Sequence, residues 1–279
     1  MSFKIIVDSC CELPQSFVKS TNTEIVPLAL DVDDYHIIDD ENFNQKEFLK
    51  KVAESPNCPR SSCPSPERYL EAMKADCDHI YVITLSAELS GSYNSAVLAK
   101  NLYHEEIGEK DIYIFDSRSA SCGETQIAFW IKELEEKSLS FQELTEQIEK
   151  KIDNRKTYFV LETLETLRKN GRLSGIKAFV ASTLNIKPIM AGTKQGSIVQ
   201  LGQARGTSKA LAKMVEISLK EVEHPEEKTL MITDCNCPER AKDVLNLYLT
   251  KAKFKDTLVM EMRGLSSLYA CDGGIIVTI

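Results

Sequence analysis

The sequence predicts an α/β fold, because apolar runs rich in β-branched residues alternate with helical patterns along the first half of the chain. We expect strands at residues 4–7, 24–30, 80–85 and 112–115. Helices are expected at residues 45–53, 66–74, 91–102, 122–136 and 141–152. Such alternation is typical of βαβ units, so a parallel sheet of the flavodoxin or Rossmann type is predicted for this half.

The second half of the chain follows a different pattern. A hairpin is expected from strands at residues 186–190 and 197–201, around Gly192 and Gly196. Further strands are expected at residues 157–161, 229–233, 257–261 and 275–279, and helices at residues 207–222 and 238–250. The polar stretch 153–156 separates the two patterns, so we predict two α/β domains, residues 1–155 and residues 156–279.

Composition and charge are those of an ordinary globular protein. The 279 residues are 43% hydrophobic and 27% charged, and the formal net charge is −8. This negative charge disfavours nucleic acid and anionic membranes as partners. The sequence contains no run of about 18 apolar residues, so we predict no transmembrane segment. Its N-terminus reads as the start of a strand rather than a secretory signal.

Nine cysteines without a signal peptide favour reduced thiols in the cytoplasm over a disulfide framework. The alternative is that some of the cysteines bind a structural zinc ion. The two close pairs, Cys10–Cys11 and Cys235–Cys237, lack the Cys-x-x-Cys spacing of zinc sites, and no histidine lies near them in sequence. We therefore predict no metal.

The segment 161–175 is predicted to end one helix and present an anion-binding group before the next. The first helix should stop at Asn170-Gly171, since both residues tolerate the left-handed conformation that ends a helix. Arg172 and Ser174 follow on the loop between the two helices. The alternative is an ordinary helical corner with a solvated arginine.

Two other segments place hydroxyl groups where a helix begins. In residues 81–96 an apolar run ends at Leu85, and Ser90-Gly91 then opens a helix. The free N–H groups and the dipole at a helix N-terminus favour an anion. Residues 60–66 place Ser61 and Ser62 just before another helix.

These segments, in this order, resemble the DegV family of fatty-acid-binding proteins, and the resemblance covers nearly the whole chain. The motifs that carry it are Asp8-Ser9 with Leu13-Pro14, residues 61–65, residues 89–96, Asp116-Ser117, Gly171-Arg172-Leu173-Ser174, and Leu184 to Pro188 with Gly196 and Arg205. Each motif is common by itself. Their shared order makes the resemblance specific.

The resemblance implies two α/β domains with a ligand cavity where they meet. It implies a non-catalytic carrier of a long-chain fatty acid, without a cofactor, that presents the bound carboxylate to a fatty-acid kinase for acyl-phosphate formation in phospholipid synthesis. The implied ligand-binding residues are Ser61, Ser62, Ser86, Ala87, Gly91, Ser92, Arg172 and Cys271. Ser61 takes the place of the family threonine that holds the carboxylate, and Arg172 that of the arginine near the head group.

Three positions depart from the family pattern at the carboxylate end. Ala87 stands in place of the second serine of a Ser-Ser pair, Cys63 in place of a glutamine, and Cys271 in place of a histidine. A thiol is a weak hydrogen-bond donor. We therefore expect fewer strong donors to the carboxylate than in typical members.

Other chemistry has little support in the sequence. It contains no Gly-x-Ser-x-Gly, His-Glu-x-x-His, Gly-x-Gly-x-x-Gly or Walker motif. Asp8-Ser9 after a strand suggests either a phosphoaspartate site or, as we favour, a carboxylate that organises the turns at the strand ends. The alternatives to a carrier are a cysteine-dependent acyl-transfer or hydrolytic enzyme that uses Cys271 or Cys63 near Arg172, and a related protein with a different lipid ligand.

Overall fold

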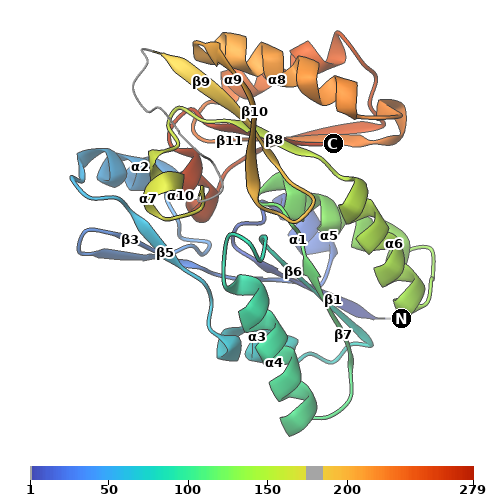
Figure 1. The fold of residues 1–279 in the computed structure, drawn as a ribbon. Helices are drawn as coiled ribbons and strands as arrows, with labels where there is room; N and C mark the ends of the chain where they lie inside the picture. Colours follow the sequence, from blue (N-terminus) through green and yellow to red (C-terminus); the bar gives the residue numbers. More distant parts are fainter. Residues whose placement is uncertain (1, 174–184) are drawn as a thin grey trace.

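The computed structural model describes residues 2–173 and 185–279, and Figure 1 shows three sheets with helices around them. The first sheet is parallel, with strand order β2-β1-β6-β7. Its strands are β1 (Phe3–Asp8), β2 (Thr23–Val26), β6 (His79–Thr84) and β7 (Asp111–Asp116). The parallel sheet predicted for the first half is thus confirmed.

Helices cover both faces of this sheet, because its strands are apolar on both sides. Ile5 and Val7 of β1 pack against one group of helices, and Ile6 between them packs against the other. The first group is α1 (Gln15–Ser20), α5 (Cys122–Glu135) and α6 (Phe141–Asn154). The second group is α3 (Pro66–Met73) and α4 (Ser92–Glu106). A capping box between Ser140 and Glu143 fixes the start of α6.

The single strand predicted at residues 24–30 is wrong. The chain instead divides into β2 and β3 (Ala29–Val32), which belong to different sheets. Pro27 lies between them and cannot donate to a ladder, so the strand pairing changes there. The resulting small antiparallel sheet has the order β4-β3-β5, with β4 (Tyr35–Ile38) and β5 (Arg60–Ser62). Helix α2 (Gln45–Glu54) follows β4 along the chain and begins at the side-chain cap of Asn44.

The second half of the chain forms a six-stranded mixed sheet of order β10-β9-β8-β13-β11-β12. Its strands are β8 (Thr157–Val160), β9 (Ile186–Gly192), β10 (Ile198–Arg205), β11 (Thr229–Asp234), β12 (Asp256–Glu261) and β13 (Ile275–Thr278). Helices α8 (Thr207–Glu221) and α9 (Pro238–Leu249) cover one face, and a short 3₁₀ helix (Pro225–Glu227) precedes β11. The predicted β9–β10 hairpin is confirmed.

The other face of this sheet looks toward the first half of the chain. Helix α5 contacts β6 on one side and β11 and β13 on the other, so it lies between the two large sheets. Two short helices, α7 (Glu165–Lys169) and α10 (Gly264–Ala270), contact one another near the small sheet, and α10 also contacts α2 and β3. The β9–β10 hairpin reaches from the six-stranded sheet toward the parallel one (Figure 1).

Helix α7 ends as predicted. Asn170 is its C-terminal cap, and Gly171 has a positive φ of 78°. The second helix expected after Gly171, together with Ser174 and Leu184, lies outside the described residues. The domain boundary at residue 155 stays a prediction. No helix within residues 2–173 and 185–279 combines the length and apolar character that a bilayer crossing needs.

Candidate functional site

An apolar cavity, which we call the slot, lies between the parallel sheet and the six-stranded sheet. Its empty volume, which includes space open to solvent, is about 760 Å³. Leu85 and Leu89 line it from the first half of the chain, and Phe159, Leu161 and Ile276 line it from the second. Helix α10, which the sequence analysis missed, adds Leu265 and Tyr269.

A second cavity of about 530 Å³, which we call the mouth, adjoins the slot. The two share five lining residues: Leu85, Leu89, Arg172, Leu265 and Tyr269. Ser61 and Ser62 at the end of β5, and Ser90 and Gly91 before α4, also line the mouth. The structure therefore brings four predicted residues, Ser61, Ser62, Gly91 and Arg172, to one polar end of an apolar slot.

Arg172 carries the positive charge of the mouth. Its Nε donates to the carbonyl of Leu89 over 3.1 Å, and its Nη1 donates to the carbonyl of Asn170. Its Cζ lies 5.8 Å from the centre of the Tyr269 ring. No carboxylate in the described residues forms an ion pair with it, and residues 174–184 contain no Asp or Glu. The guanidinium charge is thus available to an anionic ligand group.

Ser61 also has a partner in the mouth. Its Oγ lies 3.0 Å from the Tyr269 hydroxyl, which places two hydroxyl groups beside the arginine. Each hydroxyl can both donate and accept, so the pair can turn one O–H toward a carboxylate. Tyr269 had no signal in the sequence, because α10 was not predicted.

Three other predicted residues hold the loop before α4 in place and line neither cavity in the described chain. Ser86 Oγ donates to the carbonyl of Gly196 over 2.9 Å and so joins this loop to the β9–β10 hairpin. The N–H of Ala87 donates to Asp116 over 3.1 Å. Ser92 Oγ donates to Asp8 over 2.8 Å. Their predicted contact with ligand stays a prediction.

Cys271 follows α10 and also lies outside the lining of both cavities. Its Sγ lies 3.8 Å from Oγ1 of Thr166 on α7. Burial raises the pKa of the Cys271 thiol above its ordinary value, so the thiol is neutral at pH 7. Cys63, by contrast, is exposed and lines the mouth.

Polar groups that the sequence analysis missed line the far end of the slot. Ser119 Oγ lies 2.8 Å from Thr157 Oγ1, and Arg118 forms ion pairs with Glu149 and Asp153. The hairpin tip adds Ser197. The only sequence signal for this end was the turn at Gly196, which did not indicate what the turn contacts.

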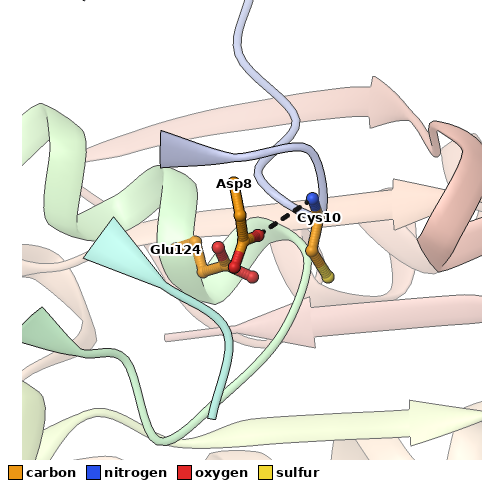
Figure 2. Close-up of side chains that lie close together, drawn as sticks. All are labelled: Asp8, Cys10 and Glu124. Atoms are coloured by element: carbon orange, nitrogen blue, oxygen red, sulfur yellow. Dashed lines mark hydrogen bonds between the residues drawn. The ribbon is translucent and has the colours of Figure 1, made fainter. Parts of the chain in front are cut away.

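Asp8, Cys10 and Glu124 form a buried group beside the slot (Figure 2). The carboxylate of Asp8 accepts hydrogen bonds from the N–H groups of Cys10 and Leu85, so it organises the turns after two strands, as the sequence analysis favoured. Three potential metal-ligand atoms lie within 4.8 Å of one another. Both oxygens of Asp8 already accept hydrogen bonds from protein groups, so we interpret this group as structural and assign no metal to it.

The fold and the site together define an α/β protein with an apolar slot that adjoins an arginine and several hydroxyl groups. Comparisons with known proteins identify it further. A sequence model described as "Uncharacterised protein, DegV family" matches residues 2–276. The chain belongs to the DegV family.

Relatives match over their full length. A DegV domain-containing protein of Streptococcus pneumoniae is 31% identical over 280 residues, covering 99% of this chain and 98% of the relative. A crystal structure of a DegV family protein from Ruminococcus gnavus, described as a refinement with vaccenic acid, has 50% sequence identity to this chain. The TM-score is 0.98, and the match covers 100% of both chains. The Streptococcus pneumoniae Fatty Acid Kinase (Fak) B3 protein loaded with linoleic acid is 30% identical with a TM-score of 0.88, covering 100% of this chain and 99% of the other.

Proposed function

We propose that this protein is a carrier of a long-chain fatty acid, with the acyl chain in the slot and the carboxylate in the mouth. The observation that carries the proposal is the continuity of an apolar slot with Arg172, a cation that forms no ion pair in the described residues. A fatty acid has the same two parts, one long apolar chain and one anionic end.

The energetics favour such a ligand. Burial of about fourteen methylenes contributes up to ~11 kcal/mol at ~0.8 kcal/mol each, before the cost of ordering the chain. A desolvated carboxylate without a partner would cost several kcal/mol. Arg172, Ser61 and Tyr269 supply donors for that charge. The vaccenic and linoleic acids named for the two solved relatives support the same assignment.

We further propose that the protein performs no catalysis itself and presents the carboxylate to a fatty-acid kinase. The support is the name of the Streptococcus pneumoniae relative, which connects it to fatty acid kinase. The mouth places the carboxylate beside an arginine, whose guanidinium suits a carboxylate and an acyl phosphate equally. Nine free thiols support the cytoplasm, a reducing compartment, as its location.

A cysteine-dependent acyl-transfer or hydrolytic enzyme is less well supported. The nucleophile would need to be a thiolate with a base nearby. Burial raises the pKa of Cys271, which keeps it protonated, and no histidine lies among the described lining residues of the slot or the mouth. A different lipid with an acidic head group is the remaining alternative, and the same experiment identifies it.

The test is mass spectrometry of the lipid released when the purified protein is denatured, combined with the melting temperature of lipid-free protein titrated with fatty acid. We expect about one acyl chain per protein, and a stabilisation of about 2.7 kcal/mol at 100 times the dissociation constant. Finding no acyl species and no rise in melting temperature would contradict the carrier.

A matched pair of variants locates the acyl chain. Gly192 lines the slot, and a Cβ there would meet only ordinary contacts, 3.7 Å from Thr157. Gly192→Ile should therefore weaken binding of long acids more than short ones. Gly202→Ile on the same hairpin is the control, since Gly202 faces Lys213 outside the slot. Equal losses from the two variants would place the chain elsewhere.

A further inference from the structure

Glu124 is a buried acid to which the proposed function gives no role. It lies on α5 with 0% exposure, and Figure 2 shows its side chain beside that of Asp8. Neither of its carboxyl oxygens receives a hydrogen bond from an N–H or hydroxyl group of the described residues. Asp8 is also 0% exposed, but it accepts from Cys10 N–H at 3.1 Å, Leu85 N–H at 2.9 Å and Ser92 Oγ at 2.8 Å.

A carboxyl oxygen of Asp8 lies within 4.8 Å of one of Glu124, and two buried carboxyl groups this close do not both ionise, so one of them holds a proton. The three donors on Asp8 stabilise its charged form, whereas Glu124 receives no N–H or hydroxyl donor and has only the weak Cys10 thiol beside it. The proton therefore belongs on Glu124, where the protonated carboxyl group can serve as a donor toward Asp8. In agreement, burial and then the neighbouring Asp8 charge raise the pKa of Glu124 well above its ordinary value.

The other ionisable groups around Glu124 do not remove the need for a proton on it. They are Cys10, Cys11 and Glu12 after β1, Tyr69 on α3, and Arg155 after α6. Glu12 accepts from Ser121 Oγ and from the N–H of Arg263, and Arg155 donates to the carbonyls of Gly123 and Ser117. The two thiols and the phenol stay neutral, because burial raises the pKa of each.

Asp8 in turn holds the wall of the mouth. Two of its three donors, Leu85 and Ser92, are the ends of segment 85–92, and Leu85, Leu89 and Gly91 of that segment line the mouth. The carbonyl of Leu89 accepts from Nε of Arg172 over 3.1 Å. A continuous series of contacts thus runs from Glu124 through Asp8 and this segment to the arginine.

We propose that protonated Glu124 is a positioning residue of the fatty-acid site, which fixes Asp8 and, through segment 85–92, the guanidinium of Arg172. The inference rests on the proposed function for its binding consequence, whereas the shared proton itself does not depend on any ligand. Glu124 touches no ligand, and its effect on binding is indirect.

The first measurement needs no ligand. Infrared spectra of the lipid-free protein at pH 8 should contain the C=O band of a protonated carboxyl group. Glu124→Gln should remove this band, and Glu133→Gln on the same helix, a half-buried acid paired with lysines, should leave it. Gln is close in size to Glu, so this variant should fold. A spectrum without the band at pH 8, or a band unchanged in Glu124→Gln, would overturn the proposal.

The second measurement is vaccenic acid affinity at pH 8, where the fatty acid is ionised. Glu124→Gln can still donate to Asp8, so its Kd should stay within about twofold of wild type. Glu124→Ala leaves Asp8 without that donor, and its Kd should rise about tenfold. An unchanged Kd in a folded Glu124→Ala would overturn the positioning role. If wild type binds no fatty acid at any pH, the carrier function fails while the infrared result still stands.

Discussion

Gly196 at the tip of the β9–β10 hairpin provides a sharp test of how the slot is closed. It has a positive φ of 92°, and a Cβ added there would lie 2.2 Å from Ser86 Oγ and 2.9 Å from the Cα of Arg118. The carbonyl of the same residue accepts the Ser86 hydroxyl over 2.9 Å. Gly196→Ala should therefore force the hairpin tip away from the parallel sheet.

The magnitude follows from two costs. The left-handed conformation costs an L-residue about 1–2 kcal/mol. Overpacking against Ser86 and against the backbone of Arg118 adds about 1–3 kcal/mol, because backbone cannot move aside as a flexible side chain can. We expect Gly196→Ala to lower the free energy of unfolding by about 2–5 kcal/mol, the sum of the two costs, which for a chain of this length is a fall in melting temperature of about 3–9 °C.

Gly171→Ala is the matched control. Gly171 also has a positive φ, 78°, but a Cβ there would meet no atom within 4 Å. It should show the conformational cost alone, about 1–2 kcal/mol. Urea unfolding of lipid-free protein measures both variants. If Gly196→Ala is no more destabilising than Gly171→Ala, the hairpin tip does not pack on Ser86, and our account of the closed slot is wrong.

Three further predictions concern charge and thiol chemistry. Arg172→Ala should raise the Kd for fatty acid at least as much as Glu124→Ala does, about tenfold, keep the affinity that comes from the buried chain, and lose acyl-phosphate formation with a cognate kinase and ATP; equal product from both proteins would remove Arg172 from the mechanism. Burial raises the pKa of Glu12 from 4.5 to about 7. The folded protein therefore binds this proton more tightly than the unfolded chain does. The free energy of unfolding should fall by about 3 kcal/mol as the pH rises from 4.5 to about 7. Glu12→Gln should flatten that part of the stability profile measured by urea unfolding, and an unchanged slope would exclude Glu12 as its cause. Cys63 should react with a thiol reagent faster than the buried cysteines, and fatty acid should slow it because Cys63 lines the mouth; mass mapping of the labelled protein checks both rates.

The elements that sequence reasoning recovered are those with a strong local pattern. The strands at Ile80 and Ile112 are continuous apolar runs between helices, and the helix end at Gly171 carries its own conformational signal. The strand spanning Pro27 was wrong, because hydrophobicity alone does not show that a chain changes sheets. Helix α10 was missed for a related reason. Its residues Gly264–Ala270 are almost all buried, so they show no amphipathic period.

For the site, too, sequence reasoning recovered only what local motifs specify. The serine and arginine motifs pointed to the mouth. Arg172 follows the turn at Gly171, which the sequence encodes locally, whereas Ser61 lies in β5 and is positioned by pairing with Leu30 of β3. The pattern did not distinguish a serine that faces the cavity from one that holds the wall, as Ser86 and Ser92 do. That choice depends on which distant group lies opposite each hydroxyl: Gly196 for one and Asp8 for the other. Substitutions at wall residues should therefore change binding through the position of segment 85–92, whereas substitutions at Ser61 should act directly on the head group.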